Sequence, residues 1–237
     1  MAKFIVIDGL DGCGKATQTE LLREALEKMG KKVVKISFPK YDSNSSAAVR
    51  MYLNGELGSD PSKLNPYMCG TFYAVDRFIQ YVTDWKKYFD EDDNTVIIAD
   101  RYLSANIIHQ AGKLESREER LKYAYWNYGL ECDRCGLPKE DMTIVLTIKP
   151  EISQRLMSQR YNGDETKKDI HEASLDYLNE CYERLKSTVY DLSKVETDGY
   201  TNWVHINCED ETGENVDTRE NIHNKIMSCI IDILKTS

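Results

Sequence analysis

The chain has 237 residues, of which 41% are hydrophobic, and this is enough for one sizeable core but not for two full domains. Its 31 Lys and Arg residues against 40 Asp and Glu residues give a net charge of −9, which disfavours a polynucleotide partner. No apolar run is long enough to cross a bilayer, and no signal-peptide pattern precedes the first apolar segment. We therefore expect a single domain over residues 1–237, with neither a nucleic acid nor a membrane as its partner.

Seven cysteines, an odd number without regular spacing, are typical of reduced thiols, so the sequence predicts a cytoplasmic protein. Cys132 and Cys135 form one C-x-x-C pair. A structural zinc site requires four ligands, and no second pair lies at the spacing of such a site. We therefore interpret this segment as a loop without metal.

The first predicted strand, residues 3–8, runs directly into the stretch 9-GLDGCGKATQ-18. Its spacing, Gly-x₄-Gly-Lys between a buried strand and a helix, is that of a phosphate-binding loop. Glycines let backbone N–H groups converge on phosphate oxygens, while the helix N-terminus and the lysine add positive charge. The sequence therefore predicts an ATP phosphate site in a loop over residues 9–16, rather than an ordinary turn. The expected contacts are Gly9, Gly12, Cys13, Gly14, Lys15, Ala16 and Thr17.

One position of this loop departs from the usual pattern. The residue after the lysine is normally Ser or Thr, whose hydroxyl helps to hold Mg²⁺, but here it is Ala16. Thr17 lies about 100° further around the helix and is a poor geometric replacement. We expect activity with a weaker Mg²⁺ affinity, and loss of turnover stays open as the alternative.

The rest of the chain alternates short β-branched runs with longer helical stretches. The helix after the phosphate loop ends at Gly30, a long helix covers 65–89, and Thr218 is the predicted N-cap of the last helix. Near-continuous apolar strands separated by helices are typical of a parallel sheet covered on both faces. The predicted fold class is therefore α/β with a five-stranded parallel sheet. Its further strands are predicted at 32–37, 95–99, 143–148 and 203–207.

Several motifs in one order resemble the thymidylate kinase family, and the resemblance covers nearly the whole chain. They are 9-GLDGCGKATQ-18, 38-FPKY-41, 71-TFYAVDR-77 and 100-DRYLSANIIHQ-110, followed by 136-GLPKEDM-142 and a segment at 155–172 that is similar to the family's lid. The resemblance implies a P-loop nucleoside-monophosphate-kinase fold and dTMP as the acceptor. It further implies ATP as co-substrate, Mg²⁺ as cofactor, and a homodimer that includes the long helix.

The resemblance also implies residues that contact dTMP. Tyr73 and Arg77 are four apart and share one helix face, where the aromatic would stack on thymine and the arginine would orient it. A core aromatic is the alternative for Tyr73. Asp11 is implied for the sugar 3′-hydroxyl, and a turn-forming aspartate is its alternative. The implied contacts are Asp11, Phe38, Lys40, Tyr73, Arg77, Arg101, Asn106 and His109.

Asp100 and Arg101 end a predicted parallel strand, where open α/β sheets bind ligands. The resemblance implies Asp100 for Mg²⁺ and Arg101 for the acceptor phosphate, and a surface ion pair is the alternative. The phosphate loop has no basic residue at its four variable positions, so the lid is expected to supply the charge that phosphoryl transfer requires. The lid cations are Arg155, Arg160, Lys167 and Lys168, of which we favour Arg160. The predicted catalytic set is Lys15, Asp100, Arg101 and Arg160.

The predicted reaction is transfer of the γ-phosphate of Mg-ATP to dTMP, giving dTDP and ADP. A monophosphate with a second pKa near ~6 is already ionised at neutral pH, so no general base is required. Another pyrimidine monophosphate, a nucleoside, or a non-catalytic nucleotide-binding protein are the alternatives. His109, where the family often has an aromatic residue, leads us to expect weaker discrimination against ribonucleotides. Cys13 leads us to expect inactivation by thiol alkylation, with protection by ATP.

Overall fold

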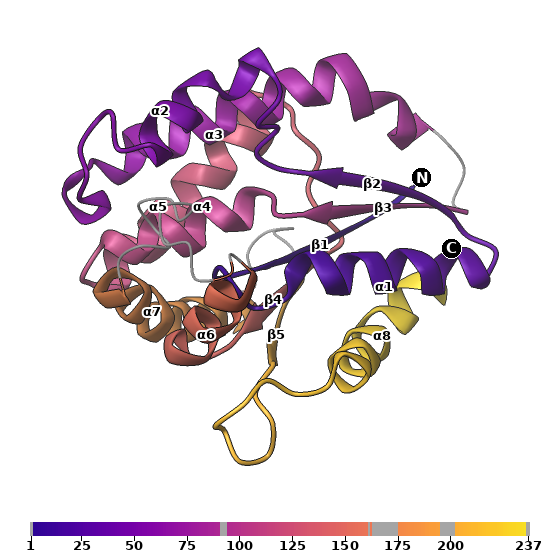
Figure 1. The fold of residues 1–237 in the computed structure, drawn as a ribbon. Helices are drawn as coiled ribbons and strands as arrows, with labels where there is room; N and C mark the ends of the chain where they lie inside the picture. Colours follow the sequence, from indigo (N-terminus) through magenta and orange to yellow (C-terminus); the bar gives the residue numbers. More distant parts are fainter. Residues whose placement is uncertain (1, 91–93, 161, 163–174, 195–201, 236–237) are drawn as a thin grey trace.

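Five parallel strands form one sheet at the centre of the computed structural model (Figure 1). The strand order is β2-β3-β1-β4-β5, so β1 lies in the middle of the sheet. The strands are β1 Lys3–Gly9, β2 Lys32–Ser37, β3 Thr95–Asp100, β4 Met142–Thr147 and β5 Asn202–Asn207. Each predicted strand is confirmed to within one residue at either end, and the predicted fold class is confirmed. The structure describes residues 2–90, 94–160, 162, 175–194 and 202–235.

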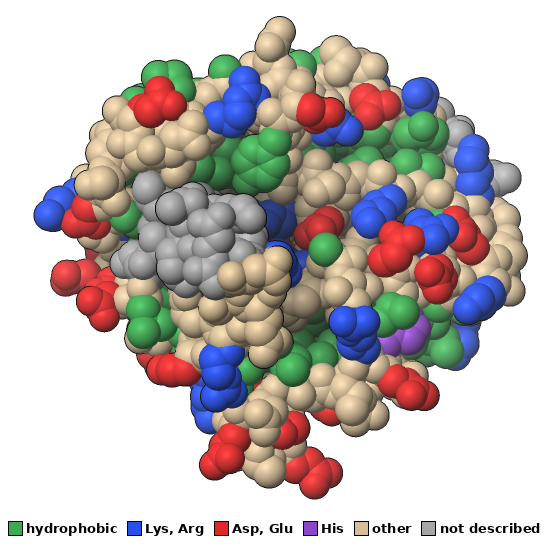
Figure 2. All heavy atoms as spheres, in the orientation of Figure 1, with side chains coloured by type: hydrophobic (Ala, Val, Ile, Leu, Met, Phe, Trp, Pro, Cys, Tyr) green, Lys and Arg blue, Asp and Glu red, His purple; other side chains and the backbone are tan. Residues whose placement is uncertain are grey.

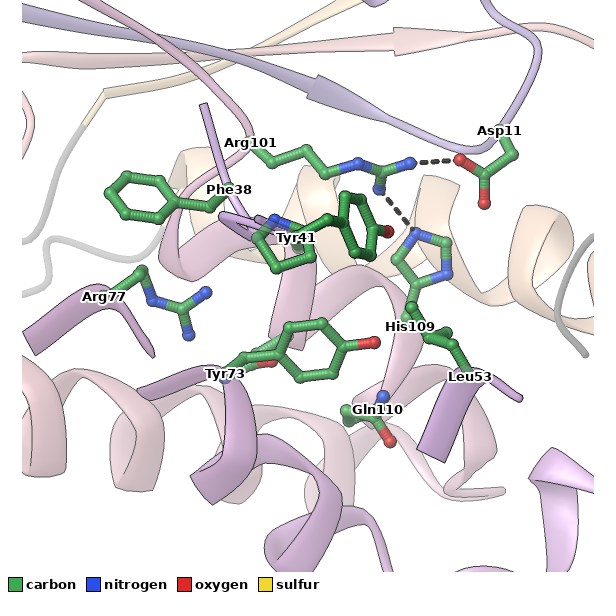
Figure 3. A pocket seen from close by; sticks show the side chains of 12 residues that line it. Asp11, Phe38, Tyr41, Leu53, Tyr73, Arg77, Arg101, His109 and Gln110 are labelled. Atoms are coloured by element: carbon green, nitrogen blue, oxygen red, sulfur yellow. Dashed lines mark hydrogen bonds and ion pairs between the residues drawn. The ribbon is translucent and has the colours of Figure 1, made fainter. Parts of the chain in front are cut away.

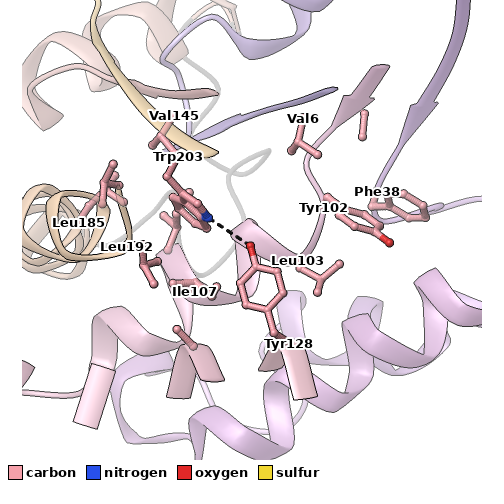
Figure 4. Packing of buried hydrophobic residues seen from close by; sticks show 14 of the residues in the cluster. Val6, Phe38, Tyr102, Leu103, Ile107, Tyr128, Val145, Leu185, Leu192 and Trp203 are labelled. Atoms are coloured by element: carbon pink, nitrogen blue, oxygen red, sulfur yellow. Dashed lines mark hydrogen bonds between the residues drawn. The ribbon is translucent and has the colours of Figure 1, made fainter. Parts of the chain in front are cut away.

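Alternate residues of the central strands are buried on opposite faces of the sheet, because successive side chains of a strand point to opposite sides. Phe4 and Val6 of β1 face a layer formed by α4 (Leu103–His109), α5 (Arg117–Tyr128) and α7 (Leu175–Lys194). Figure 4 shows part of this core, in which the indole N–H of Trp203 donates to the Tyr128 hydroxyl at 3.1 Å.

Ile5 and Ile7 of β1 face the opposite layer, formed by α1 (Lys15–Lys28) and α8 (Arg219–Lys235). Figure 1 shows these two helices together on one side of the sheet. Burial on both faces explains why the central strands β1, β3 and β4 are nearly continuous apolar runs, whereas the edge strands β2 and β5 are partly exposed.

The predicted helix ends are confirmed where their capping chemistry was clear. Gly30 follows α1 with φ +82°, in the left-handed region that favours glycine. The Thr218 hydroxyl accepts from the backbone N–H of Asn221 at 3.1 Å and thereby caps α8.

Two predictions about helical segments are corrected. The predicted helix 65–89 is helical throughout but is not one α-helix, because α3 (Pro66–Gln80) continues as a π-helical turn, Tyr81–Trp85, and then as a 3₁₀ segment, Lys86–Asp90. The segment that contains Cys132 is not a loop. It is a π-helical turn, Gly129–Arg134, which continues α5. The remaining elements are α2 Ala47–Leu53, α6 Pro150–Arg160 and the 3₁₀ segments Asn44–Ser46, Pro61–Lys63 and Ala111–Lys113.

Side chains of both signs are interspersed over the described part of the face seen in Figure 2, which agrees with a mixed surface of moderate net charge. None of the helices in the described part of the chain is long and apolar enough to span a membrane.

Candidate active site

The phosphate loop connects β1 to the N-terminus of α1 at the carboxyl edge of the sheet. Gly12 and Gly14 have φ angles of +79° and +89°, which other residues adopt only with strain. A Cβ atom on Gly12 would lie 2.9 Å from the carbonyl oxygen of Ser153, so the loop packs closely on α6. The glycines therefore let the loop backbone adopt a tight turn, of the kind whose N–H groups can converge on an anion.

Lys15 lies over the inside of this loop and is 7% exposed. Its Nζ donates to the carbonyl oxygens of Gly9 at 3.0 Å and Leu10 at 2.8 Å, and it lies 3.7 Å from the Asp11 carboxylate. The ammonium group is thus held at the loop by neutral carbonyls that a phosphate oxygen can replace.

Ala16 and Thr17 both lie on the exposed side of α1. The next hydroxyl, that of Thr19, donates to the Lys15 carbonyl at 2.9 Å and is therefore engaged within the helix. The loop presents no hydroxyl beside Lys15, as the sequence indicates.

A second group of charged residues lies next to the loop and joins three segments that are distant in sequence. Arg101 follows β3, with a φ of +69° that is rare for a residue with a side chain. Its Nη2 pairs with the Asp11 carboxylate, and its Nη1 lies 3.1 Å from the His109 Nε2 (Figure 3). One guanidinium therefore connects the phosphate loop to α4.

Charges around Arg101 stabilise its protonated form. Burial by itself would lower the pKa of Arg101, but the carboxylates of Asp11, Asp8 and Asp100 outweigh this effect and raise the pKa. The guanidinium is therefore a permanent cation at the edge of the loop, suited to an anionic ligand.

Asp8 was missed by the sequence analysis, although an acidic residue at the end of an apolar strand is a usable signal. It is fully buried beneath the loop and accepts from the Gly9 N–H at 2.8 Å and the Ser104 hydroxyl at 2.5 Å. Burial raises the pKa of its carboxyl, and the charges of Arg101 and Lys15 oppose that rise. Asp8 thus supports the loop from below and has no open path to a ligand.

A single pocket gathers most of the residues implied for dTMP. Figure 3 shows Tyr73 and Arg77 directed into it from α3, opposite Arg101 and His109. Five further lining residues were not among the implied contacts, although all of them except Leu53 lie within the quoted motifs: Pro39, Tyr41, Leu53, Ala105 and Gln110. The pocket is lined by Asp11, Phe38, Pro39, Tyr41, Leu53, Tyr73, Arg77, Arg101, Ala105, Asn106, His109 and Gln110.

Lys40 is the implied dTMP contact that does not line this pocket. Its side chain is exposed and borders a separate hollow that includes Lys35 and Gln80. Its backbone N–H donates to Asp76 at 2.9 Å, which turns the chain after β2 so that the neighbouring Tyr41 reaches the pocket instead.

Arg77 has an anionic partner that the sequence did not identify. Its Nε and Nη2 both donate to the Glu131 carboxylate at 2.6 Å, and both side chains are 1% exposed. Burial by itself would lower the pKa of Arg77, but the charge of Glu131 raises it.

The lid prediction can be placed only in part. Arg155 and Arg160 belong to α6 and are exposed, and Arg155 donates to the Glu214 carbonyl at 2.5 Å. Lys167, Lys168 and most of 155–172 lie outside the described residues.

Cys13 lies in the loop as expected, but its thiol is not positioned for easy alkylation. It is 2% exposed, and burial raises the pKa of the thiol although Lys15 lies nearby. The thiolate is the nucleophile, so the expectation of ready inactivation is corrected.

We expect iodoacetamide at pH 7 to modify the half-buried Cys135 and Cys229 at least ~10-fold faster than Cys13, because the Cys13 thiol is buried and the reagent cannot reach it in the folded protein. Mass spectrometry of peptides from timed samples measures the three rates. Equal rates in the folded protein would contradict the buried position of Cys13.

Comparison with known proteins places the chain in a family. A sequence profile described as thymidylate kinase matches residues 7–202. Thymidylate kinase of Mycobacterium tuberculosis (strain CDC 1551 / Oshkosh) is 32% identical over 153 residues, which cover 63% of this chain and 68% of that protein. Thymidylate kinase of Bifidobacterium longum is 29% identical over 178 residues, which cover 73% and 82%.

A solved structure of thymidylate kinase from Candida albicans has the same fold, with a TM-score of 0.66 at 18% identity over 98% of this chain and 92% of that one. Because the family profile spans most of the sequence, the chain belongs to the thymidylate kinase family.

Proposed function

We propose that this protein transfers the γ-phosphate of Mg-ATP to dTMP, giving dTDP and ADP. The observation that carries the proposal is the position of Arg101, which contacts the phosphate loop through Asp11 and lines the acceptor pocket beside His109. A cation between the two sites can approach the acceptor phosphate and the transferred phosphoryl group together. Family membership supports the same reaction.

Lys15 and the loop N–H groups would hold the β- and γ-phosphates of ATP. Two of the predicted lid cations, Arg155 and Arg160, belong to the described residues. We assign Arg160, at the end of α6, to the γ-phosphate oxygens. The acceptor oxygen is already ionised at neutral pH, so the reaction requires positioning and charge neutralisation rather than a base.

The residues fit a magnesium ion that arrives with ATP. Among the described residues, no group of three or more His, Cys, Asp or Glu side chains could form a metal cage, and the Asp100 carboxylate makes no hydrogen bond. Mg²⁺ is usually bound by one or two carboxylates together with phosphates and water. Asp100 would hold it, directly or through water, and the bound ion would neutralise phosphate charge.

The hydrogen-bonding groups of the pocket are complementary to those of a 4-oxo pyrimidine. After its bonds to Glu131 and to the Tyr102 carbonyl, Arg77 keeps one hydrogen on Nη1 and one on Nη2. The Nδ2 of Asn106 is directed at the Gly70 carbonyl oxygen, at 3.1 Å, so its Oδ1 is the atom left for a ligand. A donor and an acceptor together match O4 and N3–H of thymine or uracil and mismatch cytosine. Tyr73 would stack on the base.

A second candidate is a kinase for another 4-oxo pyrimidine monophosphate. His109, 5% exposed in the pocket wall, favours it because an imidazole can hydrogen-bond a ribose hydroxyl. The thymidylate kinase of Candida albicans, whose structure has the same fold, is described as having broad substrate specificity.

ADP release from Mg-ATP with dTMP, dUMP, UMP, dCMP, CMP and thymidine tests these candidates. We expect dTMP to give the highest kcat/KM, and dCMP and CMP to be at least ~100-fold poorer, because their 4-amino group faces the Arg77 donor. A preference for UMP would support the second candidate. No turnover in protein that binds ATP would indicate that Ala16 has abolished catalysis.

We further propose a homodimer through α3. Met68, Val75, Phe78 and Val82 are exposed apolar residues at helical spacing on α3 and the turn that follows it, and a two-fold axis would pair this face with itself. Sedimentation equilibrium that gives a mass near 27.3 kDa would contradict the dimer. The seven cysteines are unbonded, which supports a reducing compartment such as the cytoplasm.

A further inference from the structure

Glu131 lies behind the acceptor pocket without lining it. It belongs to the π-helical turn after α5 and is fully buried. Its Oε2 accepts from Arg77 Nε at 2.6 Å, and its Oε1 accepts from Arg77 Nη2 at 2.6 Å and from Asn106 Nδ2 at 3.3 Å. One buried carboxylate therefore contacts both residues that would hydrogen-bond to the base.

The orientation of the Asn106 amide follows from its neighbours. Its Nδ2 lies near three acceptors, which are the Gly70 carbonyl, the Glu131 carboxylate and the Asn127 Oδ1 at 3.1 Å. A carbonyl and a carboxylate only accept, so the atom facing them is the donor nitrogen. Asn127 is itself oriented by its Nδ2, which donates to the Leu103 carbonyl at 3.3 Å. Oδ1 of Asn106 is consequently left as an acceptor for the pocket.

The position of Arg77 depends on the same carboxylate. A guanidinium that is 1% exposed requires a counter-charge, and two parallel N–H···O bonds define both its place and its plane. The Tyr102 carbonyl, 3.2 Å from Nη1, is a neutral third contact and cannot replace the charge. Figure 3 shows the guanidinium of Arg77 directed toward the pocket, so its remaining Nη hydrogens are left for a ligand there.

We propose that Glu131 is the positioning residue that sets the hydrogen-bond polarity of the base subsite, and thereby makes the enzyme select 4-oxo over 4-amino pyrimidine monophosphates. It acts through Arg77 and Asn106, and does not touch the substrate. The inference rests on the proposed function, because it assumes that these two residues contact the base.

The substitution Glu131→Gln tests the inference with little change of shape. An amide offers one oxygen where the carboxylate has two, so an NH₂ group must face either Arg77 Nε or the pair formed by Arg77 Nη2 and Asn106 Nδ2. Either orientation sets a donor against a donor. We expect the ratio of kcat/KM for dTMP to that for dCMP to fall by about 10- to 100-fold, as for a lost charged hydrogen bond. KM for dTMP should rise more than kcat falls.

Glu140→Gln is the matched control. Glu140 is also buried, at 3% exposure, and accepts from the hydroxyls of Tyr128 and Thr143, away from the pocket. This variant should keep the dTMP/dCMP ratio within about twofold, whatever its melting temperature.

A double-mutant cycle separates positioning from a general structural role. In an Arg77→Met background, Glu131→Gln should lower the ratio of kcat/KM for dTMP to that for dCMP by no more than ~3-fold. The reason is that the Arg77 guanidinium, through which Glu131 mainly acts, is absent. An undiminished effect in that background would overturn the inference.

The further outcomes are distinguishable. If the wild-type enzyme does not prefer dTMP over dCMP, this contradicts the proposed contacts of Arg77 and Asn106 with the base, and the inference with them. A discriminating wild type with an equally discriminating, folded Glu131→Gln variant overturns the inference alone. If that variant shows no cooperative thermal transition, Glu131→Asp replaces it, since it keeps the charge but is too short for all three bonds. An unchanged ratio in Glu131→Asp would then overturn the inference.

Discussion

Replacing Lys15 by methionine is expected to lower kcat for dTMP phosphorylation by about 10²–10³-fold. Methionine keeps the length of the side chain but removes the cation that the loop holds between the Gly9 and Leu10 carbonyls. Charge that develops on the phosphates would then lose the lysine of the loop, and loss of one such contact has an effect of this size. Initial rates of ADP release at saturating ATP and dTMP measure the change.

Lys28→Met is the control, because Lys28 is an exposed lysine in the last turn of the same helix. It should leave kcat within about twofold of the wild type. A Lys15→Met enzyme whose kcat falls less than ~5-fold, with an unchanged thermal transition, would contradict the role of Lys15 in the phosphate site.

Replacing Arg101 by methionine is expected to lower kcat/KM for dTMP by about 10³-fold. The guanidinium is the cation that pairs with Asp11 and reaches His109. Without it, the carboxylates of Asp11 and Asp100 would repel the incoming phosphate with less compensation. Both weaker acceptor binding and poorer stabilisation of the transferred charge contribute. Steady-state kinetics with dTMP varied at saturating ATP separate the two contributions.

Arg101→Lys provides a graded comparison. It keeps the charge but cannot contact Asp11 and His109 with two separate nitrogens, so we expect it to recover only part of the loss. Arg23→Met, which removes a half-buried arginine paired with Glu20 and Glu27 on α1, should have little effect on kinetics. A full recovery by Arg101→Lys would mean that only its charge is required.

Much of the site could be located from the sequence because it is carried by local patterns. The loop glycines precede Lys15 at fixed spacing, and Tyr73 and Arg77 share a helix face at a separation of four. Asp100 ends β3, which pairs with β1, and Arg101 follows it. Because parallel strands end at the same edge of a sheet, both residues lie near the phosphate loop that follows β1.

Lys40 shows the limit of such reasoning. It follows β2 as expected, yet the hydrogen bond from its backbone to Asp76 turns its side chain away from the pocket. Cys13 was similarly placed in the loop, but its thiol is buried because it joins the apolar cluster formed with α1 and α8. A motif locates a residue along the chain and does not determine where its side chain points.

The sequence by itself determined the class of fold, the five strands, the phosphate loop and the segments that approach one another. These features follow from short-range periodicity and from backbone chemistry that each residue carries with it. Only the tertiary structure decided the partners: Glu131 for Arg77, 54 residues away, and Asp11 for Arg101, 90 residues away. Such pairs depend on the packing of helices against the sheet to within a few tenths of an ångström, and no local pattern in the sequence encodes that distance.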